Sequence, residues 1–192
     1  NNPNAAMIGP GIIQKNNIIE LPMFSRIKPF NYIVNNICYP IYILYYRLQR
    51  RRMQNIQRPI RVYSVSGCCF MIRANVLKEI GYLDENVFLY GEEYILGEKL
   101  HKKGYEAYFI PTIRLTHQHS KTIGSYYTAM EILKKQHESH KYYLNCYRKD
   151  INSIIRTIMI GSECFKLKLY IPIIIFIKRN LIALYKITLL IR

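Results

Sequence analysis

Two adjacent glutamates, Glu92 and Glu93, are the residues whose type and spacing first suggest chemistry. The chain has 12 Asp and Glu residues against 28 Lys and Arg, and half of these acids lie between positions 79 and 98. Carboxylates held close together repel one another, which raises the pKa of at least one of them and makes it a candidate general base. The alternative is that the pair only decorates a helix start, where free N–H groups favour negative charge. The acids in question are Glu79, Asp84, Glu85, Glu92, Glu93 and Glu98.

The elements expected around this pair alternate between strands and short helices. Such alternation predicts an α/β layered fold. Proline at 111 predicts a turn that divides residues 105–117 into two strands, and Gly81 and Gly104 predict helix ends. The expected strands are 61–65, 67–73, 105–111 and 112–117, and the expected helices are 74–80 and 92–103.

The first part of the chain gives weaker signals. Residues 4–13 predict a strand that ends in a Gly-Pro-Gly turn. Residues 1–13 lack the basic and apolar regions of a signal peptide, so we expect a piece of a longer protein. Residues 39–52 (YPIYILYYRLQRRR) indicate either an interfacial or anion-facing element, or a core-packed helix with a solvated basic end.

The tail from Ser153 onward is cationic, with Glu163 as its only acid. Its apolar run does not reach the roughly 20 uninterrupted residues of a spanning helix. If residues 173–192 are helical, four cations lie within an arc of roughly 140°, opposite a continuous apolar face. This pattern predicts a helix in a membrane interface, and the alternative is a terminal helix docked on the domain. The four cations are Lys178, Arg179, Lys186 and Arg192.

A formal net charge of +16 indicates a polyanionic partner, such as a phosphorylated substrate, an anionic membrane surface or nucleic acid. Nucleic acid is the less favoured partner because no reader motif accompanies the charge. The five cysteines are odd in number and form no C-x-x-C pair. They predict buried thiols of a reducing compartment rather than a disulfide framework.

The segment QHESHKYY carries His137 and His140 at a spacing that differs from the H-E-x-x-H of zinc proteases. A solvated helix face is the favoured interpretation of the two histidines. The neighbouring tyrosines Tyr142, Tyr143 and Tyr147 are expected to pack in a core or an interface.

An ordered series of motifs resembles the second half of a family-2 glycosyltransferase catalytic domain, of the rhamnosyltransferase-like kind that builds bacterial surface polysaccharides. The resemblance covers about residues 62–122, and residues 1–12 extend it. In chain order the motifs are Ser66-Gly67, Arg73, Gly81, Asp84-Glu85, the FLYGEE loop at 88–93, Gly104-Tyr105, Pro111 and His117.

What the resemblance implies is a partial GT-A (Rossmann-like) α/β domain with a C-terminal amphipathic helical tail. Residues 1–150 would be the acceptor half of the catalytic domain, and residues 151–192 a basic, membrane-interfacial tail. The implied activity is inverting transfer from a nucleotide-sugar donor to a glycan or lipid-linked acceptor. It would take place at the cytoplasmic face of the membrane.

The resemblance also implies roles for individual residues. Glu93, beside Glu92, would be the catalytic base that accepts the proton of the acceptor hydroxyl. His117 is either a ligand of Mn²⁺ or Mg²⁺ or a structural residue. The positions implied to bind substrate are Asp84, Gly67, Tyr90 and Gly91.

The chain departs from the family pattern at several points. Glu93 stands where the family normally has aspartate, Ile95 where it has a second aspartate, and Lys99 near the usual arginine. No Asp-x-Asp occurs in the 192 residues, and the resemblance would place that motif and the donor pocket before Asn1. We therefore expect this chain to be inactive alone. The competing interpretation is a non-catalytic basic module that binds anionic membrane or nucleic acid.

Overall fold

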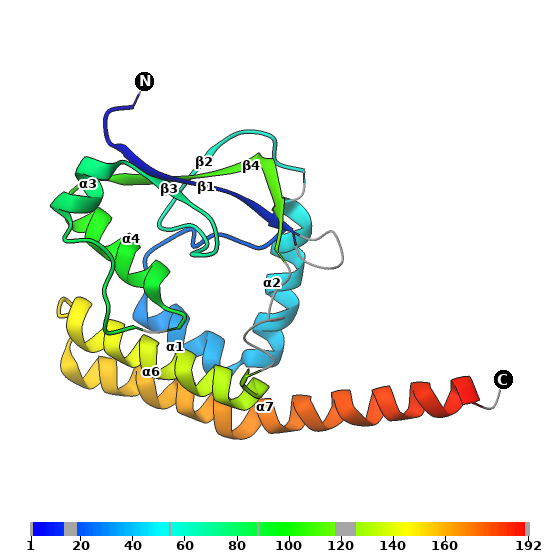
Figure 1. Cartoon of the computed structure of the whole chain (residues 1–192). Coiled ribbons are helices and arrows are strands. Elements are labelled where there is room, and N and C mark those ends of the chain that lie inside the picture. The colour runs from blue at the N-terminus through cyan, green and yellow to red at the C-terminus, as the bar shows by residue number, and fades with distance from the viewer. Residues whose placement is uncertain (1, 14–18, 54, 88, 118–125, 191–192) are drawn as a thin grey trace.

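A computed structural model of the chain describes all residues except 1, 14–18, 54, 88, 118–125 and 191–192 (Figure 1). Its strands are β1 (Ala5–Ile13), β2 (Ile60–Val62), β3 (Met71–Ile72) and β4 (Glu106–Thr116). Its helices are α1 (Pro29–Ile37), α2 (Tyr39–Met53), α3 (Ala74–Glu79), α4 (Glu92–Lys102), α6 (Ala129–Tyr147) and α7 (Ser153–Leu190).

The four strands form one mixed sheet in the order β2-β4-β1-β3. The central strands β1 and β4 run parallel, and β2 and β3 pair antiparallel with them at the two edges. The sheet lies on one side of the molecule and the long helices on the other (Figure 1). The predicted α/β class is therefore confirmed as a mixed sheet with helices.

Two predicted turns are instead strand interior. Strand β1 continues through Gly9-Pro10-Gly11, and β4 continues through Pro111. The pairing of the two strands shifts here, because Pro10 pairs with Ile110 while Gly11 pairs with Arg114. Proline cannot donate to a sheet, and a bulge accommodates it without ending the strand.

The edge strands are shorter than predicted. In place of the expected strands 61–65 and 67–73, the structure has the shorter strands Ile60–Val62 and Met71–Ile72. The backbone N–H of Gly67 donates to a side chain of α4 instead of to a neighbouring strand. A side-chain acceptor therefore replaces the sheet at this position.

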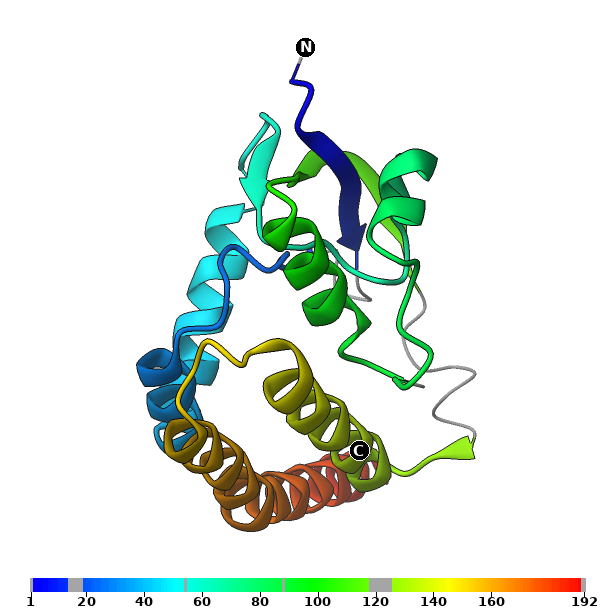
Figure 2. The same cartoon turned by 90° about the vertical axis from the view of Figure 1, so that its left-hand side faces the viewer.

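Helix α4 lies between the sheet and helix α6 (Figures 1 and 2), and it contributes to two hydrophobic cores. Its residues Leu96 and Leu100 pack in the core beneath the sheet, with Met7 and Phe109. Its residue Ile95 packs instead in a helical core. That helical core also contains Tyr143, Leu144, Ile151 and Met159, so it extends across the predicted domain boundary at residue 150.

Helix α6 and the first part of α7 are held together by a buried charge. The two carboxylate oxygens of Glu163 accept hydrogen bonds from the Nδ1 atoms of His137 at 2.9 Å and His140 at 2.8 Å. The side chains of the two histidines are only 16% and 17% exposed. The prediction of a solvated histidine face was therefore wrong, because the partner lies on another helix.

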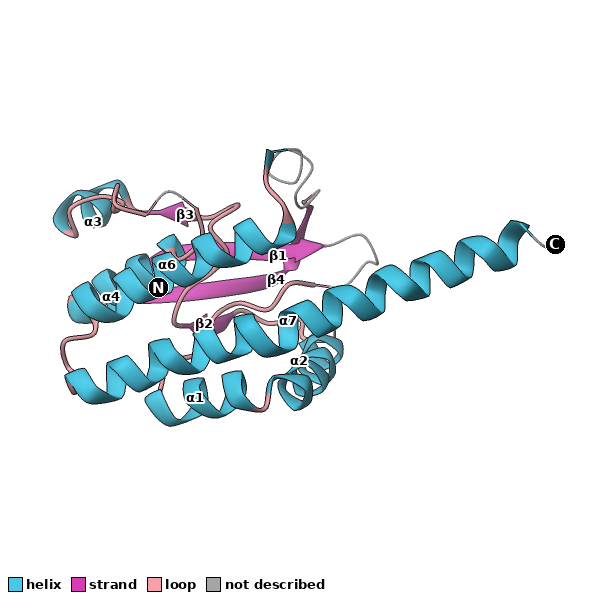
Figure 3. Cartoon of the chain, turned by 90° about the horizontal axis from the view of Figure 1, so that it is seen from below, coloured by secondary structure: helices cyan, strands magenta, loops and turns pink. Residues whose placement is uncertain are grey.

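Helix α7 is longer than the predicted tail helix and begins at Ser153. Its first part packs against α1 and α6, and its second part projects from the body (Figures 1 and 3). The side chains of Lys178, Arg179, Lys186 and Arg192 lie outside the described part of the chain. Within the residues that the structure describes, no helix is both long enough and apolar enough to cross a membrane.

Neither the described side chains of helix α2 nor the cysteines are buried in a core. No described side chain of α2 is buried, and Ile41, Leu44, Tyr45 and Leu48 are exposed. The core-packed interpretation of residues 39–52 was therefore wrong. All five cysteines are free, but Cys38, Cys68 and Cys146 are exposed and Cys69 and Cys164 are only partly buried, so the prediction of buried thiols was wrong.

Candidate functional site

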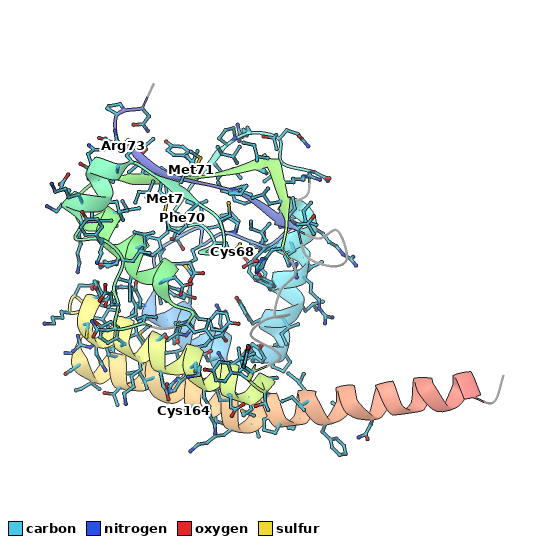
Figure 4. The ribbon with its side chains drawn as sticks, in the orientation of Figure 1. Met7, Cys68, Phe70, Met71, Arg73 and Cys164 are labelled. Carbon is cyan, nitrogen blue, oxygen red and sulfur yellow. The ribbon has the colours of Figure 1, made fainter. Side chains whose placement is uncertain are left out.

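A pocket of about 280 Å³ opens beside the first turn of α4. Four of the residues predicted from the sequence line it: Gly67, Asp84, Glu92 and Glu93. Phe70, which also lines it, lies on the helix side of β1, as does Cys68 (Figure 4). The remaining lining residues are Val65, Leu83, Val87 and Leu96, so apolar walls surround a small set of carboxylates.

The Glu93 carboxylate is fixed in position. Its Oε1 atom accepts a hydrogen bond of 3.1 Å from the backbone N–H of Gly67. Burial raises the pKa of Glu93, and the adjacent charge of Glu92 raises it further, although backbone hydrogen bonds oppose both effects. A held carboxyl group with a raised pKa is suited to accept a proton.

Gly67 allows the carboxylates to approach the turn that precedes β3. A Cβ atom at this position would lie 2.8 Å from Oε1 of Glu92 and 3.0 Å from Oε1 of Glu93. Both distances are shorter than ordinary contacts, so any other residue would displace the acid pair. Gly67 therefore acts on the site through Glu93.

The loop before α4 has an unusual backbone. Tyr90 and Gly91 both have positive φ angles, 63° and 92°. Gly91 then accepts the first helical hydrogen bonds, which places Glu92 and Glu93 in the first turn of α4. Burial raises the pKa of the Tyr90 hydroxyl, and the nearby charges of Glu92 and Glu93 raise it further.

Helix α6 supports this loop from the other side. A Cβ atom on Gly91 would lie 2.9 Å from the Cβ of Ser139, so the two backbones touch closely. The Ser139 hydroxyl donates to the carbonyl of Leu89 at 3.2 Å. Helix α6 thus holds the loop at Leu89 and Gly91, on either side of Tyr90. The predicted residues Tyr90 and Gly91 are not in the pocket lining.

Two tyrosines of α6 hold Asp84, a residue of the pocket lining. The hydroxyl of Tyr147 donates to Oδ2 of Asp84 at 2.5 Å, and that of Tyr142 donates to the same atom at 3.0 Å. Although burial opposes ionisation, these bonds and two from Asn86 lower the pKa of Asp84 to about 2. The sequence placed both tyrosines in general packing, because no local signal links α6 to residue 84.

The acidic cluster of the sequence divides into separate structural roles. Glu98 is completely buried and pairs with Arg26, while the Tyr63 hydroxyl donates to it at 2.7 Å. Glu79 accepts from Tyr105 at 2.7 Å and lies 3.4 Å from Lys103. Only Asp84, Glu92 and Glu93 of the six acids line the pocket.

Comparison with protein families identifies the family to which the chain is related. The family model described as glycosyltransferase like family 2 matches residues 14–139, which is more than half of the chain. The chain belongs to glycosyltransferase family 2. The resemblance drawn from the sequence motifs is thereby confirmed at the level of the family, whose members transfer sugars with inversion.

Curated relatives match a shorter part of this family-2 chain. They are the N-acetylglucosaminyl-diphospho-decaprenol L-rhamnosyltransferases of Mycobacterium tuberculosis strains CDC 1551 / Oshkosh and ATCC 25618 / H37Rv. Each is 28% identical over 76 residues. The match covers 40% of this chain and 24% of the length of each relative.

Family-2 glycosyltransferases commonly use a divalent metal. His117, the predicted ligand, is exposed directly after β4. Its backbone N–H donates to the backbone carbonyl of Ile13 at 3.1 Å. It is not among the residues that line the pocket. Over the described ranges, no group of three or more His, Cys, Asp or Glu could hold a metal ion. The described residues therefore do not form a metal site by themselves.

Proposed function

We propose that this chain is the acceptor half of an inverting family-2 glycosyltransferase. It would act on a sugar from a nucleotide-sugar donor and transfer it to a glycan or lipid-linked acceptor in bacterial surface polysaccharide synthesis. The observation that carries the proposal is Glu93, a fixed carboxyl group with a raised pKa in the wall of a pocket.

In the proposed reaction the acceptor hydroxyl lies against Glu93. Its oxygen attacks the anomeric carbon of the donor sugar, and the bond from that carbon to the diphosphate breaks. The hydroxyl proton passes to the Glu93 carboxylate, and the transition state resembles an oxocarbenium ion. Glu92 contributes by raising the pKa of Glu93, which brings the base closer to the pH at which it works.

The rest of the pocket is proposed to bind the acceptor. Asp84 stays ionised because of its hydrogen bonds from two tyrosines, so it accepts hydrogen bonds from sugar hydroxyls. Phe70, Leu83 and Val87 offer apolar surface to the faces of a sugar ring. The volume of 280 Å³ is near the lower end of ligand pockets, which favours a single ring over a long chain.

The other residues and segments singled out from the sequence are proposed to keep their predicted roles. Tyr90 and Gly91 would contact substrate at the edge of the pocket, beside the acid pair. His117 would be one ligand of Mn²⁺ or Mg²⁺ only together with groups beyond the described residues. Residues 1–150 would form the acceptor half, inactive by itself, and residues 151–192 the tail.

Association with the cytoplasmic face of the membrane is supported by the exposed surface of α7. Eight apolar residues of this helix are between 39% and 69% exposed, and at about 100° per residue they fall within an arc of about 140°. A lipid-linked acceptor also agrees with the decaprenol named in the mycobacterial relatives. The eight residues, called here the α7 apolar face, are Ile154, Ile155, Ile158, Phe165, Leu169, Ile173, Phe176 and Ile177.

The second candidate is a non-catalytic basic module on an anionic membrane. The α7 apolar face and the exposed arginines of α2 support membrane binding without any catalysis. Nucleic acid remains the less favoured ligand, because it offers no partner for an apolar face. The two candidates differ in what they require of Glu93.

An assay of sugar transfer by the full-length gene product tests the proposal. The Glu93→Gln variant keeps the side-chain shape and its acceptor atom for Gly67 but cannot take a proton. Loss of general-base catalysis predicts a decrease in kcat of about 100-fold or more. Glu85→Gln, an exposed acid outside the pocket lining, serves as the matched control and should retain activity.

Thermal unfolding of both variants shows that the fold is kept. Equal turnover by the Glu93→Gln variant and the unmodified protein would remove Glu93 from the mechanism. A complete lack of transfer by the full-length gene product with Glu93 intact, with membrane binding retained, would favour the second candidate.

A further inference from the structure

A second cluster of reactive groups lies between α6 and α7, outside the pocket. It consists of Cys164 and Glu163 on α7 and His137 on α6. Cys164 lies on α7, well away from Phe70 and Cys68 (Figure 4). The proposed sugar transfer does not use these residues.

The three side chains are arranged in a line. The Sγ atom of Cys164 lies 3.3 Å from Nε2 of His137, and Nδ1 of the same imidazole lies 2.9 Å from Oε2 of Glu163. An ionised carboxylate only accepts hydrogen bonds, so Nδ1 of His137 carries the hydrogen. Nε2 is then free to accept the thiol hydrogen of Cys164. This is the order of nucleophile, base and orienting acid that activates thiols in catalytic sites.

The carboxylate of Glu163 is rigidly placed and ionised. It is only 4% exposed, and it also accepts from the Tyr32 hydroxyl at 2.9 Å and from His140 at 2.8 Å. Burial opposes its ionisation, yet the hydrogen bonds from the two histidines hold the pKa of Glu163 well below the ordinary value. A fixed negative charge behind His137 stabilises the imidazolium that forms when the thiol gives up its proton.

Three other cysteines lack this arrangement. Cys68 has the Ser66 hydroxyl at 3.4 Å as its partner, and burial raises the pKa of its thiol, which disfavours the reactive thiolate. Cys38 and Cys146 are exposed, and no hydrogen bond to a histidine is found for either among the described residues. Cys164 is less exposed than these three but still reaches solvent in part.

We propose that Cys164 is a nucleophilic thiol that peroxides oxidise to sulfenic acid, with His137 as its base. His137 takes the thiol proton, and the thiolate sulfur attacks one oxygen of the peroxide. The S–O bond forms as the O–O bond breaks, and the departing oxygen takes the proton back from His137. With hydrogen peroxide the products are Cys164 sulfenic acid and water, so sulfur is oxidised by two electrons and the peroxide is reduced by two.

The consequence of oxidation would be local to the α6–α7 interface. Ser139, which supports the loop before Glu93, lies two residues after His137 on the same helix. A modified Cys164 therefore lies on the helix pair that supports the sugar-transfer pocket.

The test treats the whole chain with hydrogen peroxide in the presence of dimedone, which traps sulfenic acids. Mass spectrometry of peptides then gives a labelling rate for each cysteine. Cys164 should label at least tenfold faster than Cys38 and Cys146, although both of these are more exposed. Labelling in simple order of exposure would overturn the proposal without the need for any variant.

Two variants test the base and its support. His137→Gln and Glu163→Gln should each slow labelling of Cys164 about tenfold and leave Cys146 unchanged. The direction of the change in labelling rate is decisive, because a mere loosening of α6 from α7 would expose Cys164 and make its labelling faster. An unchanged or faster rate at Cys164 in both variants would overturn the role of His137.

Discussion

At the scale of single residues, the acid pair shows how neighbours set the chemistry of one group. Glu92 and Glu93 are consecutive in the first turn of α4, but only Glu93 receives the Gly67 N–H. That bond favours the ionised form of Glu93, while burial and the charge of Glu92 oppose it more strongly. The net effect is a carboxyl group that holds its proton more tightly than an ordinary glutamate.

This balance predicts a pH effect of Glu92→Gln. The base must be ionised, so a raised pKa of Glu93 places the acidic limb of kcat/KM above the ordinary pKa of glutamate. Removing the charge of Glu92 eases ionisation of Glu93, and the acidic limb should move to lower pH. A pH profile of sugar transfer measures this, with Glu85→Gln as the control that should leave the limb in place. A limb that stays fixed or moves to higher pH in Glu92→Gln would contradict the coupling.

At the scale of elements, α4 is positioned by contacts on two sides. Its Leu96 and Leu100 belong to the core under the sheet, and its Ile95 belongs to the helical core. The buried Glu98 pairs with Arg26, which also lies 3.0 Å from Asp150. The helix is therefore fixed relative to both layers, which keeps the acid pair of its first turn in the pocket wall.

The contact between Gly91 and Ser139 gives a prediction for stability. Gly91→Ala adds a Cβ at a positive φ of 92° and 2.9 Å from the Cβ of Ser139, so it should destabilise the fold by about 3 kcal/mol. Gly104→Ala is the matched control, because its φ of 77° costs about 1 kcal/mol but no atom lies within 4 Å of the added Cβ. Urea unfolding measures both free energies. Equal losses in the two variants would mean that the α6 contact does not hold the loop.

At the scale of the whole molecule, the sheet, the helical layer and the projecting part of α7 present different surfaces. The pocket opens beside α4, whereas the α7 apolar face continues from the body into the projecting segment. A net charge of +16 favours approach to an anionic surface, and apolar side chains add affinity on contact. The fold thus separates the proposed chemical site from the proposed membrane contact.

Vesicle binding tests this separation. Ile173→Ser combined with Phe176→Ser removes two exposed side chains, each contributing about 1.5–3 kcal/mol when buried in lipid. Binding to vesicles that contain anionic phospholipid, measured by sedimentation, should fall at least tenfold. Ile113→Ser, at a side chain of β4 that is 55% exposed, is the matched control and should bind normally. Loss of binding in the control alone would place the membrane contact on the sheet.

The sequence by itself determined the features whose signals are local. Acids at the start and Gly104 after the end placed α4 close to its observed bounds, Glu92–Lys102, and the ordered motifs indicated the family. The tertiary structure alone decided that Pro111 lies within a strand, that Tyr142 and Tyr147 bind Asp84, and that two histidines share Glu163. The reason is separation along the chain. A helix end depends on residues a few positions apart, whereas a hydrogen bond between Tyr147 and Asp84 depends on how α6 packs against the distant loop between α3 and α4.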